Sequence, residues 1–419
     1  MMDGYEGSEW TDLLRRIRND DPNVTSLNIN QIAAIDENYS CENWEELGRD
    51  ISNNTHMKKV ILIHHSEALD DQKISFLFRG LTRSSSIKVF ELYNNDLSEG
   101  VRGMVPFLQN ATNLTKLDLD GSNIRGAAGF NVLFRALRDS PIEELLCNDC
   151  GIESIEIDSE NKPKHLKQLY LDGNSINADG CREIAKLMQG EDATLTELHL
   201  AYNNINDDGV EALVDALQTN TSLAGLDLKE NGGISKQGKI MLLKLVNDIS
   251  SIEATLRSNH TLDEIQITYG ISDADAQIWQ HIDIATEINC NEGSPGRAKV
   301  IKTQLDSERR AELSELQGVN QSLYSEIDPL HLPEVLALVG NHHGQEEFYV
   351  ALKASIAGVI SIVNEKEGLK KQWEYHNAIV SEHRAKMDAI EARIAAIEAS
   401  EAPVVDIGSE CRSNKRRRK

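Results

Sequence analysis

Two short segments of this sequence have residue types and spacings that could support metal or nucleotide chemistry. Cys147 and Cys150 are spaced as metal ligands, but no second cysteine pair lies at a suitable distance. The stretch 233–240 (GISKQGKI) nearly matches a phosphate-binding loop, yet Ile240 stands where that loop needs Ser or Thr for magnesium. We therefore interpret both segments as structural.

Histidines form two further candidate groups. The pair His342-His343 precedes acidic residues at 346–347, which could share a helical face as metal ligands, but Gly344 would interrupt that helix. The pair His64-His65 falls at the end of a predicted strand. No Gly-x-Ser-x-Gly or His-Glu-x-x-His motif occurs. We expect no catalytic residue, no metal and no cofactor, and so a protein that is not an enzyme.

Composition narrows the kind of partner. The 419 residues carry 43 Lys and Arg against 68 Asp and Glu, a formal net charge of −25, which disfavours nonspecific binding to nucleic acid or to an anionic membrane. No apolar run is long enough for a membrane span. Six cysteines in a chain of this length predict no disulfide framework. We expect an intracellular protein of the nucleus or cytoplasm.

The elements that position these residues follow from a repeated frame: apolar, x, x, apolar, x, apolar, x, x, then Asn or a substitute. The frame starts at residues 57, 87, 114, 142, 166, 195, 223 and 262. From 87 to 223 the starts are 24 to 29 residues apart. The fourth and sixth places alternate on a short strand and point into a core, and the ninth can bond backbone groups of adjacent turns. Apolar spacing after the strand predicts a helix in each unit.

This pattern resembles the leucine-rich repeat family, in particular its ribonuclease-inhibitor-like subclass. The resemblance extends from about Val24 to Gly270 and implies an α/β solenoid shaped as a horseshoe, with parallel strands on the concave face and helices on the convex face. It implies protein recognition through the concave face. The stretch LLRRIRNDDPNVTSLNIN also resembles the start of the leucine-rich domain of tropomodulins.

Composition and spacing divide the chain into five predicted regions. These are an N-terminal cap with a degenerate first repeat (1–56), the repeats (57–270), a helical connecting region (271–345), a long helix or short coiled coil (346–400) and a disordered basic tail (401–419). A helix of the cap would bury Trp10, Leu13, Leu14 and Ile17. Because the spacing from Leu223 to Leu262 is 39 residues, we expect a lengthened or additional helix there.

Two features of the C-terminal part suggest further contacts. A heptad over 369–397 places Trp373 at an a position and pairs charges across g and e, which favours a parallel homodimer, although His376 and His383 at d weaken that interpretation. The tail ends in five consecutive basic residues, which fit a nuclear-import signal as well as a solvated tail or electrostatic tether. These residues are Lys415, Arg416, Arg417, Arg418 and Lys419.

The outward places of the frame, namely the third, fifth, seventh and eighth, are strongly biased toward acids and tyrosines. The acids are Glu91, Asp118, Asp120, Glu144, Asp149, Asp172, Glu197, Asp227, Glu230 and Glu264, and the tyrosines are Tyr93, Tyr170, Tyr202 and Tyr269. From Ile87 to Gly270 only Lys116 and Lys229 at these places are basic. Adjacent carboxylates would repel one another, so we predict a basic protein partner.

The sequence thus favours a non-catalytic interaction scaffold whose concave face holds a basic protein. An alternative is a regulator of a specific machine, because the family includes the Ran GTPase-activating protein and the tropomodulin actin filament cap. No activating residue of the former can be matched onto this chain.

Overall fold

The computed structural model describes residues 7–29, 39–63, 71–97, 100–124, 129–158, 162–268, 273–304 and 306–319. Tyr269, both histidine pairs, the predicted coiled coil over 369–397 and the basic tail lie outside these residues. No helix of the described part is long and apolar enough to cross a membrane.

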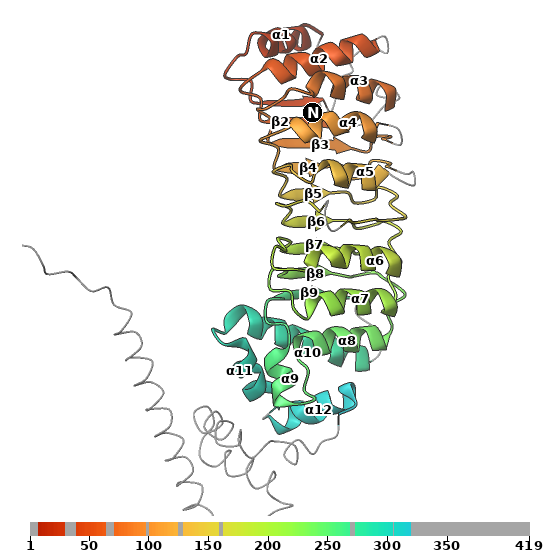
Figure 1. The fold of residues 1–419 in the computed structure, drawn as a ribbon, viewed down its shortest axis with the longest axis vertical. Coiled ribbons are helices and arrows are strands. Elements are labelled where there is room, and N and C mark those ends of the chain that lie inside the picture. Colours follow the sequence, from red (N-terminus) through yellow and green to blue (C-terminus); the bar gives the residue numbers. More distant parts are fainter. Residues whose placement is uncertain are drawn as a thin grey trace, which may run out of the picture. The chain divides into compact units, whose positions relative to one another are not determined.

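Nine parallel strands form one sheet in chain order, as Figure 1 shows. The strands are β1 (Ser26–Ile29), β2 (Lys59–Ile63), β3 (Val89–Tyr93), β4 (Lys116–Asp118), β5 (Glu144–Leu146), β6 (Gln168–Tyr170), β7 (Glu197–His199), β8 (Gly225–Asp227) and β9 (Glu264–Gln266). The frame aligns exactly from strand to strand, since its fourth residues Phe90, Leu117, Leu145 and Leu169 pair in register. The predicted α/β leucine-rich repeat solenoid is confirmed.

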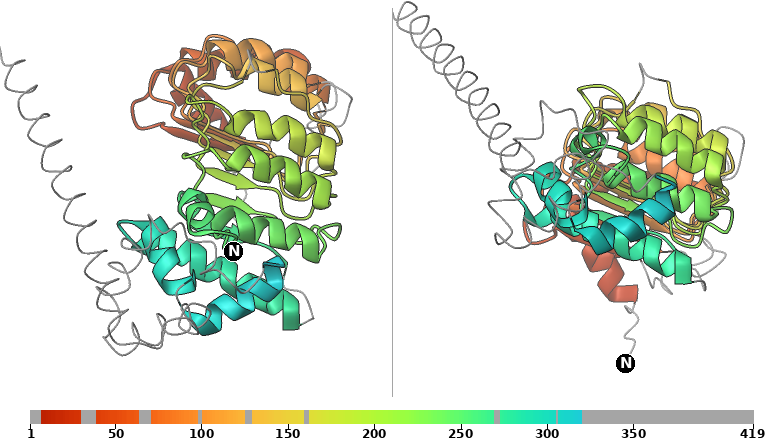
Figure 2. Two further views of the ribbon diagram at one scale, coloured as in Figure 1. Left: turned by 60° about the horizontal axis from the view of Figure 1, so that its bottom comes forward. Right: turned by 90° about the horizontal axis from the view of Figure 1, so that it is seen from below.

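Helices pack along one side of this sheet, and further helices lie at its two ends (Figures 1 and 2). They are α1 (Gly7–Arg18), α2 (Cys41–Asn53), α3 (Asp71–Leu81), α4 (Val101–Asn110), α5 (Gly129–Ala136), α6 (Ala178–Ala185), the 3-10 turn η1 (Lys186–Met188), α7 (Asp207–Leu217), α8 (Lys236–Val246), α9 (Ile252–Arg257), α10 (Asp273–Asn291), α11 (Pro295–Lys299), the π-helical turn η2 (Val300–Gln304) and α12 (Ser307–Gln317). In α7, for example, the helically spaced Val210, Leu213, Val214 and Leu217 are buried. The predicted additional helix before β9 is confirmed as α9.

One unit departs from the predicted strand-plus-helix pattern. The described residues between β5 and β6 contain no helix. Two side chains of neighbouring units hold its extended backbone instead, because Asn131 Oδ1 accepts from the Glu156 amide at 2.9 Å and Glu183 Oε2 accepts from the Ile157 amide at 2.7 Å. Ile155 and Ile157 are buried, as expected for alternation rather than helical spacing. The expectation of a helix in every unit was wrong for this unit.

The ninth residues of the frame connect adjacent units, as predicted. The Asn203 carboxamide donates to the Leu171 carbonyl of the preceding unit at 2.9 Å and to the Leu200 carbonyl of its own unit at 3.2 Å. Its oxygen accepts from the Ile176 amide at 3.0 Å. Asn174 and Asn231 make equivalent contacts. We call these side chains the asparagine ladder.

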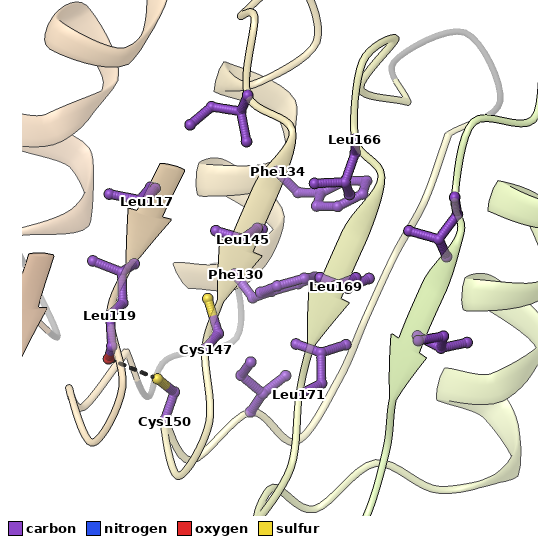
Figure 3. Close-up of a cluster of buried hydrophobic side chains, with 14 of the residues drawn as sticks. Leu117, Leu119, Phe130, Phe134, Leu145, Cys147, Cys150, Leu166, Leu169 and Leu171 are labelled. Atoms are coloured by element: carbon purple, nitrogen blue, oxygen red, sulfur yellow. Dashed lines mark hydrogen bonds between the residues drawn. The ribbon is translucent and has the colours of Figure 1, made fainter. Parts of the chain in front are cut away.

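Cys147 and Cys150 are buried and belong to the core, as Figure 3 shows. Cys150 replaces a ladder asparagine, and its thiol lies 3.1 Å from the Leu119 carbonyl. Burial raises the pKa of the Cys147 thiol well above its usual value. A protonated, buried thiol is a poor metal ligand, which agrees with the structural interpretation of this pair.

The two ends of the sheet are covered differently. At the N-terminal end α1 buries Trp10 and Ile17, while Leu13 and Leu14 are partly buried, so the predicted apolar cap is present. At the other end Ile278 and Ile282 of α10 and Leu313 of α12 are buried in the core, and a polar contact lies beside them. Lys299 is fully buried, and its Nζ lies 2.5 Å from the Val246 carbonyl, 3.1 Å from the Asn259 carbonyl and 3.1 Å from His260 Nδ1.

Candidate functional site

The candidate site is the sheet surface formed by the outward places of the frame, which we call the strand face. Register brings outward residues of neighbouring units side by side, as in the row Tyr170, His199 and Asp227 across β6, β7 and β8. Neighbouring strands are about 4.8 Å apart, so these side chains are in contact range. The strand face divides into an N-terminal half (β2–β5) and a C-terminal half (β6–β9).

Two acids of the N-terminal half form ion pairs with lysines of the preceding strand. Lys59 Nζ lies 2.7 Å from Glu91 Oε1, and Lys116 Nζ lies 2.6 Å from Glu144 Oε1. Glu91 is 7% exposed, so the sequence-based picture of it as an exposed acid was wrong. Lys59 precedes the repeats from which the excess of acids was judged, and it neutralises part of that excess within the chain.

Tyr93 and Asp118 form a second buried contact of the N-terminal half. The Tyr93 hydroxyl donates to Asp118 Oδ2 at 2.9 Å, and Asp118 is only 3% exposed. Burial raises the pKa of Asp118, and the nearby Asp120 carboxylate adds to this effect. Burial and the bond to Asp118 likewise raise the pKa of the Tyr93 hydroxyl. Both residues therefore serve the packing of the sheet, and Asp118 is not the exposed acid that the frame suggested.

Two further acids accept hydrogen bonds from backbone amides of the following unit. Asp120 Oδ1 accepts from the Asn148 amide at 2.9 Å, and Asp172 Oδ1 accepts from the Ala201 amide at 2.7 Å. Burial raises the pKa of Asp172. A carboxylate at the seventh place thus holds the turn of the next unit, which gives these acids a structural reason to be present.

The C-terminal half carries an aromatic pair beside an acid. The rings of Tyr170 and His199 are stacked, with centroids 4.3 Å apart and planes at 21°. The Tyr170 hydroxyl donates to Glu197 Oε2 at 3.0 Å. Partial burial, reinforced by this bond, raises the pKa of Tyr170 to about 12. The hydroxyl therefore stays protonated, and its ring remains partly accessible.

Lysines contribute less to the C-terminal half. Lys229 Nζ lies 3.9 Å from Asp227 Oδ2 and bonds the side-chain oxygen of Gln266. Among the described residues, no lysine or arginine forms an ion pair with Glu197, Glu230 or Glu264. Glu230 and Glu264 are exposed. Asp149, in the turn after β5, is exposed as well. Of the predicted acids, the exposed ones are therefore Asp149 in the N-terminal half and Glu230 and Glu264 in the C-terminal half.

The eighth places of the frame share a left-handed backbone that sequence reasoning missed. Their φ angles lie between 52° and 69°, and the residues are Asn94, Gly121, Asp149, Gly173, Tyr202 and Glu230. This conformation lets the amide at the eighth place donate to the seventh carbonyl of the next unit, as Tyr202 does to Lys229 at 2.9 Å. Asn94 and Gly121, the eighth residues of the first two of these units, are types that readily adopt this conformation and could have predicted it.

Tyr202 stands out in this row. It is 65% exposed, one of only two large hydrophobic residues exposed in the described part of the chain. Its φ of 54° costs a bulky residue roughly 1 to 2 kcal/mol relative to the right-handed region. Neither packing nor backbone preference therefore explains a tyrosine at this turn.

The phosphate-loop-like stretch belongs to a helix and its N-terminal cap. Residues 236–240 of the loop-like stretch form the first turns of α8, where Ser235 Oγ accepts from the Gln237 amide and so caps the helix. Lys239 Nζ lies 3.0 Å from Asp275 Oδ1. No three His, Cys, Asp or Glu side chains in the described ranges are grouped so that they could hold a metal ion.

Comparison with known protein families identifies two of the repeats. The leucine-rich repeat family model matches residues 162–185 and 191–214, which contain β6 with α6 and β7 with α7. The comparison with curated protein sequences gave no match.

Solved structures give weak likenesses. The tropomodulin C-terminal domain of Caenorhabditis elegans is 18% identical, covering 35% of this chain and 84% of its own, with a TM-score of 0.27. Actin-binding site 2 of leiomodin-1 is 12% identical, covering 74% of this chain and 96% of its own, with a TM-score of 0.21. A chain of the yeast Rad7 and Elc1 complex is 17% identical, covering 54% of this chain and 62% of its own, with a TM-score of 0.33. These likenesses carry no inference about partners.

Proposed function

We propose that this leucine-rich repeat protein is a non-catalytic interaction scaffold that binds a basic protein partner on the C-terminal half of its strand face. The observation that carries the proposal is Tyr202, a 65% exposed aromatic residue in a left-handed turn. Backbone strain at a non-glycine residue persists where the surrounding structure enforces it, and such residues cluster at functional sites. Exposed tyrosines are frequent binding hot spots.

The acidic side chains of the strand face support a partner that is basic. Glu230 follows the same turn geometry as Tyr202 one unit later and is exposed. With Glu197 and Glu264 it adds three carboxylates that no lysine or arginine of the described ranges neutralises by an ion pair. A partner bearing Lys or Arg would pair with these acids and could place its cation over the Tyr202 ring.

The alternatives from sequence, a Ran-type GTPase activator and a tropomodulin-like actin cap, gain no specific residue from this geometry. The parallel homodimer through 369–397 and nuclear import by 415–419 stay predictions, because both segments lie outside the described residues.

The experiment is a selection of random-sequence displayed peptides on the immobilised full chain, eluted at increasing salt. The proposal expects selected peptides to be rich in Lys and Arg, to elute with salt, and to bind the Tyr202→Ala variant at least about tenfold more weakly. Peptides without basic enrichment, or with equal affinity for that variant, would contradict it. Tyr5→Ala, which replaces another tyrosine at a distant place in the sequence, is the matched control and should leave affinity unchanged.

A further inference from the structure

The helix side of the solenoid changes charge from unit to unit. Helices α3, α4 and α5, which follow one another in Figure 1, together hold four basic residues and one acid, Asp71. Helix α7, by contrast, holds four acids and no basic residue. The basic residues of α3 to α5 are Lys73, Arg79, Arg102 and Arg135. This local excess of positive charge stands against a net charge of −25 for the whole chain.

Helix α3 presents a stacked arginine on its outer side. The helix buries Leu77 and Phe78 in the core, while Arg79 is exposed and Phe76 is only partly buried. The guanidinium carbon of Arg79 lies 4.4 Å from the centroid of the Phe76 ring. This cation–π contact restrains the guanidinium and leaves the N–H groups at its edge open to an acceptor. Arg83, in the turn that ends α3, is exposed as well.

A further exposed arginine, Arg102, lies on the neighbouring helix α4. Gly103, the next residue, packs against α3, because a Cβ at this position would lie 3.2 Å from Ser75 Oγ. Ser75 is one helical turn before Arg79. Packed helices are about 8–10 Å apart, so Arg79 and Arg102 can both reach one extended segment. We define the arginine face as Phe76, Arg79, Arg83 and Arg102.

The arginines of this face are not neutralised by nearby acids. Among the residues that the structure describes, Arg79, Arg83 and Arg102 form no ion pair. On the neighbouring helix α2, Arg49 Nη1 instead lies 3.2 Å from Glu45 Oε1. Arginines of α1 and α6 likewise pair with acids. The positive charge of the arginine face is therefore available to a partner.

We propose that the arginine face binds an acidic segment of a protein partner. A carboxylate can accept two parallel N–H bonds from one guanidinium, so Arg79 and Arg102 would each hold one Asp or Glu side chain. The partly exposed ring of Phe76 would contact an apolar side chain of the same segment. This binding does not depend on the basic partner of the proposed function, because it uses the helices rather than the strand face.

Nucleic acid fits the arginine face less well than an acidic protein segment. The net charge of −25 repels a polyanion, and a long strand would also meet the acids of α7. A short acidic segment needs only α3 and α4, where the unpaired arginines lie.

The experiment titrates the full chain into a dye-labelled peptide of nine residues with the repeat Glu-Glu-Leu, followed by fluorescence anisotropy. We expect saturable binding that weakens with salt. Arg79→Gln combined with Arg102→Gln should weaken binding at least about tenfold. Arg79→Lys with Arg102→Lys, which keeps both charges but removes the planar guanidinium, should weaken it about threefold.

The matched control is Arg15→Gln with Arg49→Gln, which removes two exposed arginines that already pair with acids. It should change the affinity less than about twofold. Absence of saturable binding, or a loss in this control equal to that of the Arg79 and Arg102 pair, would overturn the arginine face as a binding surface. Undiminished affinity of the lysine variant would contradict recognition through two parallel bonds.

A single-stranded DNA of nine nucleotides distinguishes the class of partner. Tighter binding of this DNA than of the acidic peptide would overturn the assignment to a protein segment. Tyr202→Ala should leave the affinity for the acidic peptide unchanged, because Tyr202 lies in a strand-face turn. A failed titration here would therefore leave the basic-partner proposal standing, and a failed selection of basic peptides would leave the arginine face standing.

Discussion

The two halves of the strand face have similar residue types but use them differently. On β2–β5 the Tyr93 hydroxyl bonds Asp118 and Lys59 pairs with Glu91, while Asp149 is the exposed acid of this half. On β6–β9 the Tyr170 hydroxyl likewise bonds Glu197, but Tyr202 and Glu230 are exposed at left-handed turns. The same acid-and-tyrosine pattern therefore stabilises the fold in one half and is available to a partner in the other.

The largest expected effect is a difference in peptide affinity between variants of the two halves. The double variant Tyr170→Ala and Tyr202→Ala should weaken the affinity for a selected basic peptide by about 100-fold, since each is a hot-spot candidate. Tyr93→Ala, in the N-terminal half, should change that affinity by less than about threefold. Isothermal titration calorimetry measures both, and equal losses in the two variants would erase the distinction between the halves.

Sequence reasoning predicted the repeats because the strand alternation and the ladder asparagine recur at fixed places. It did not predict which acids are buried. Glu91 pairs with Lys59, an outward residue of the preceding unit that lies before the range in which the acids were counted. It also missed the left-handed eighth place, because Tyr202 and Glu230 are residues that rarely adopt it. A contact between two particular side chains of neighbouring units does not recur along the chain, so it cannot be recognised as a sequence repeat.

A second prediction uses the buried Lys299 beyond the last strand. Burial lowers the pKa of Lys299 to about 7 from its ordinary 10.5. Between these two values the unfolded chain holds a proton that the folded chain lacks, so the contribution of Lys299 to the free energy of unfolding should rise with pH. We expect this contribution to rise by roughly 2 kcal/mol, less than the full shift would give, because three acceptors favour the ammonium form.

Denaturant unfolding from pH 7 to pH 10 measures this slope for the wild type and for Lys299→Met. The variant should lose most of the rise. Lys302→Met, on the same helical segment but partly exposed and paired with Glu292, is the control and should keep it. Burial also raises the pKa of the Cys147 and Cys181 thiols, which lowers stability with pH in all three proteins alike. A difference between the wild type and Lys299→Met that does not rise with pH would contradict the role assigned to Lys299.

A third prediction compares the two tyrosine hydroxyls. Tyr93→Phe should lower the free energy of unfolding by about 1 to 2 kcal/mol, because Asp118 would be left buried without that donor. Tyr170→Phe should cost less than about 1 kcal/mol, since water can replace the donor at the half-buried Glu197. Thermal unfolding of both variants checks the order, and the reverse order would refute the division of the face.

The smallest effect concerns charge. Glu230→Gln should slow association with a basic peptide about threefold at low salt and have no effect at high salt, as expected for an exposed acid. Glu144→Gln should change the association rate less, because Lys116 already neutralises Glu144. Stopped-flow association at two salt concentrations tests this, and a larger effect at Glu144 would contradict it.

The most direct test of the central claim is Tyr202→Gly, measured both for unfolding and for peptide affinity. Glycine relieves the left-handed turn, so the free energy of unfolding should rise by roughly 0.5 to 1 kcal/mol after the entropy cost of glycine, while affinity falls at least about tenfold. Tyr202→Phe should keep both values close to those of the wild type. A Tyr202→Gly protein that is less stable, or that binds as tightly as the wild type, would contradict the account.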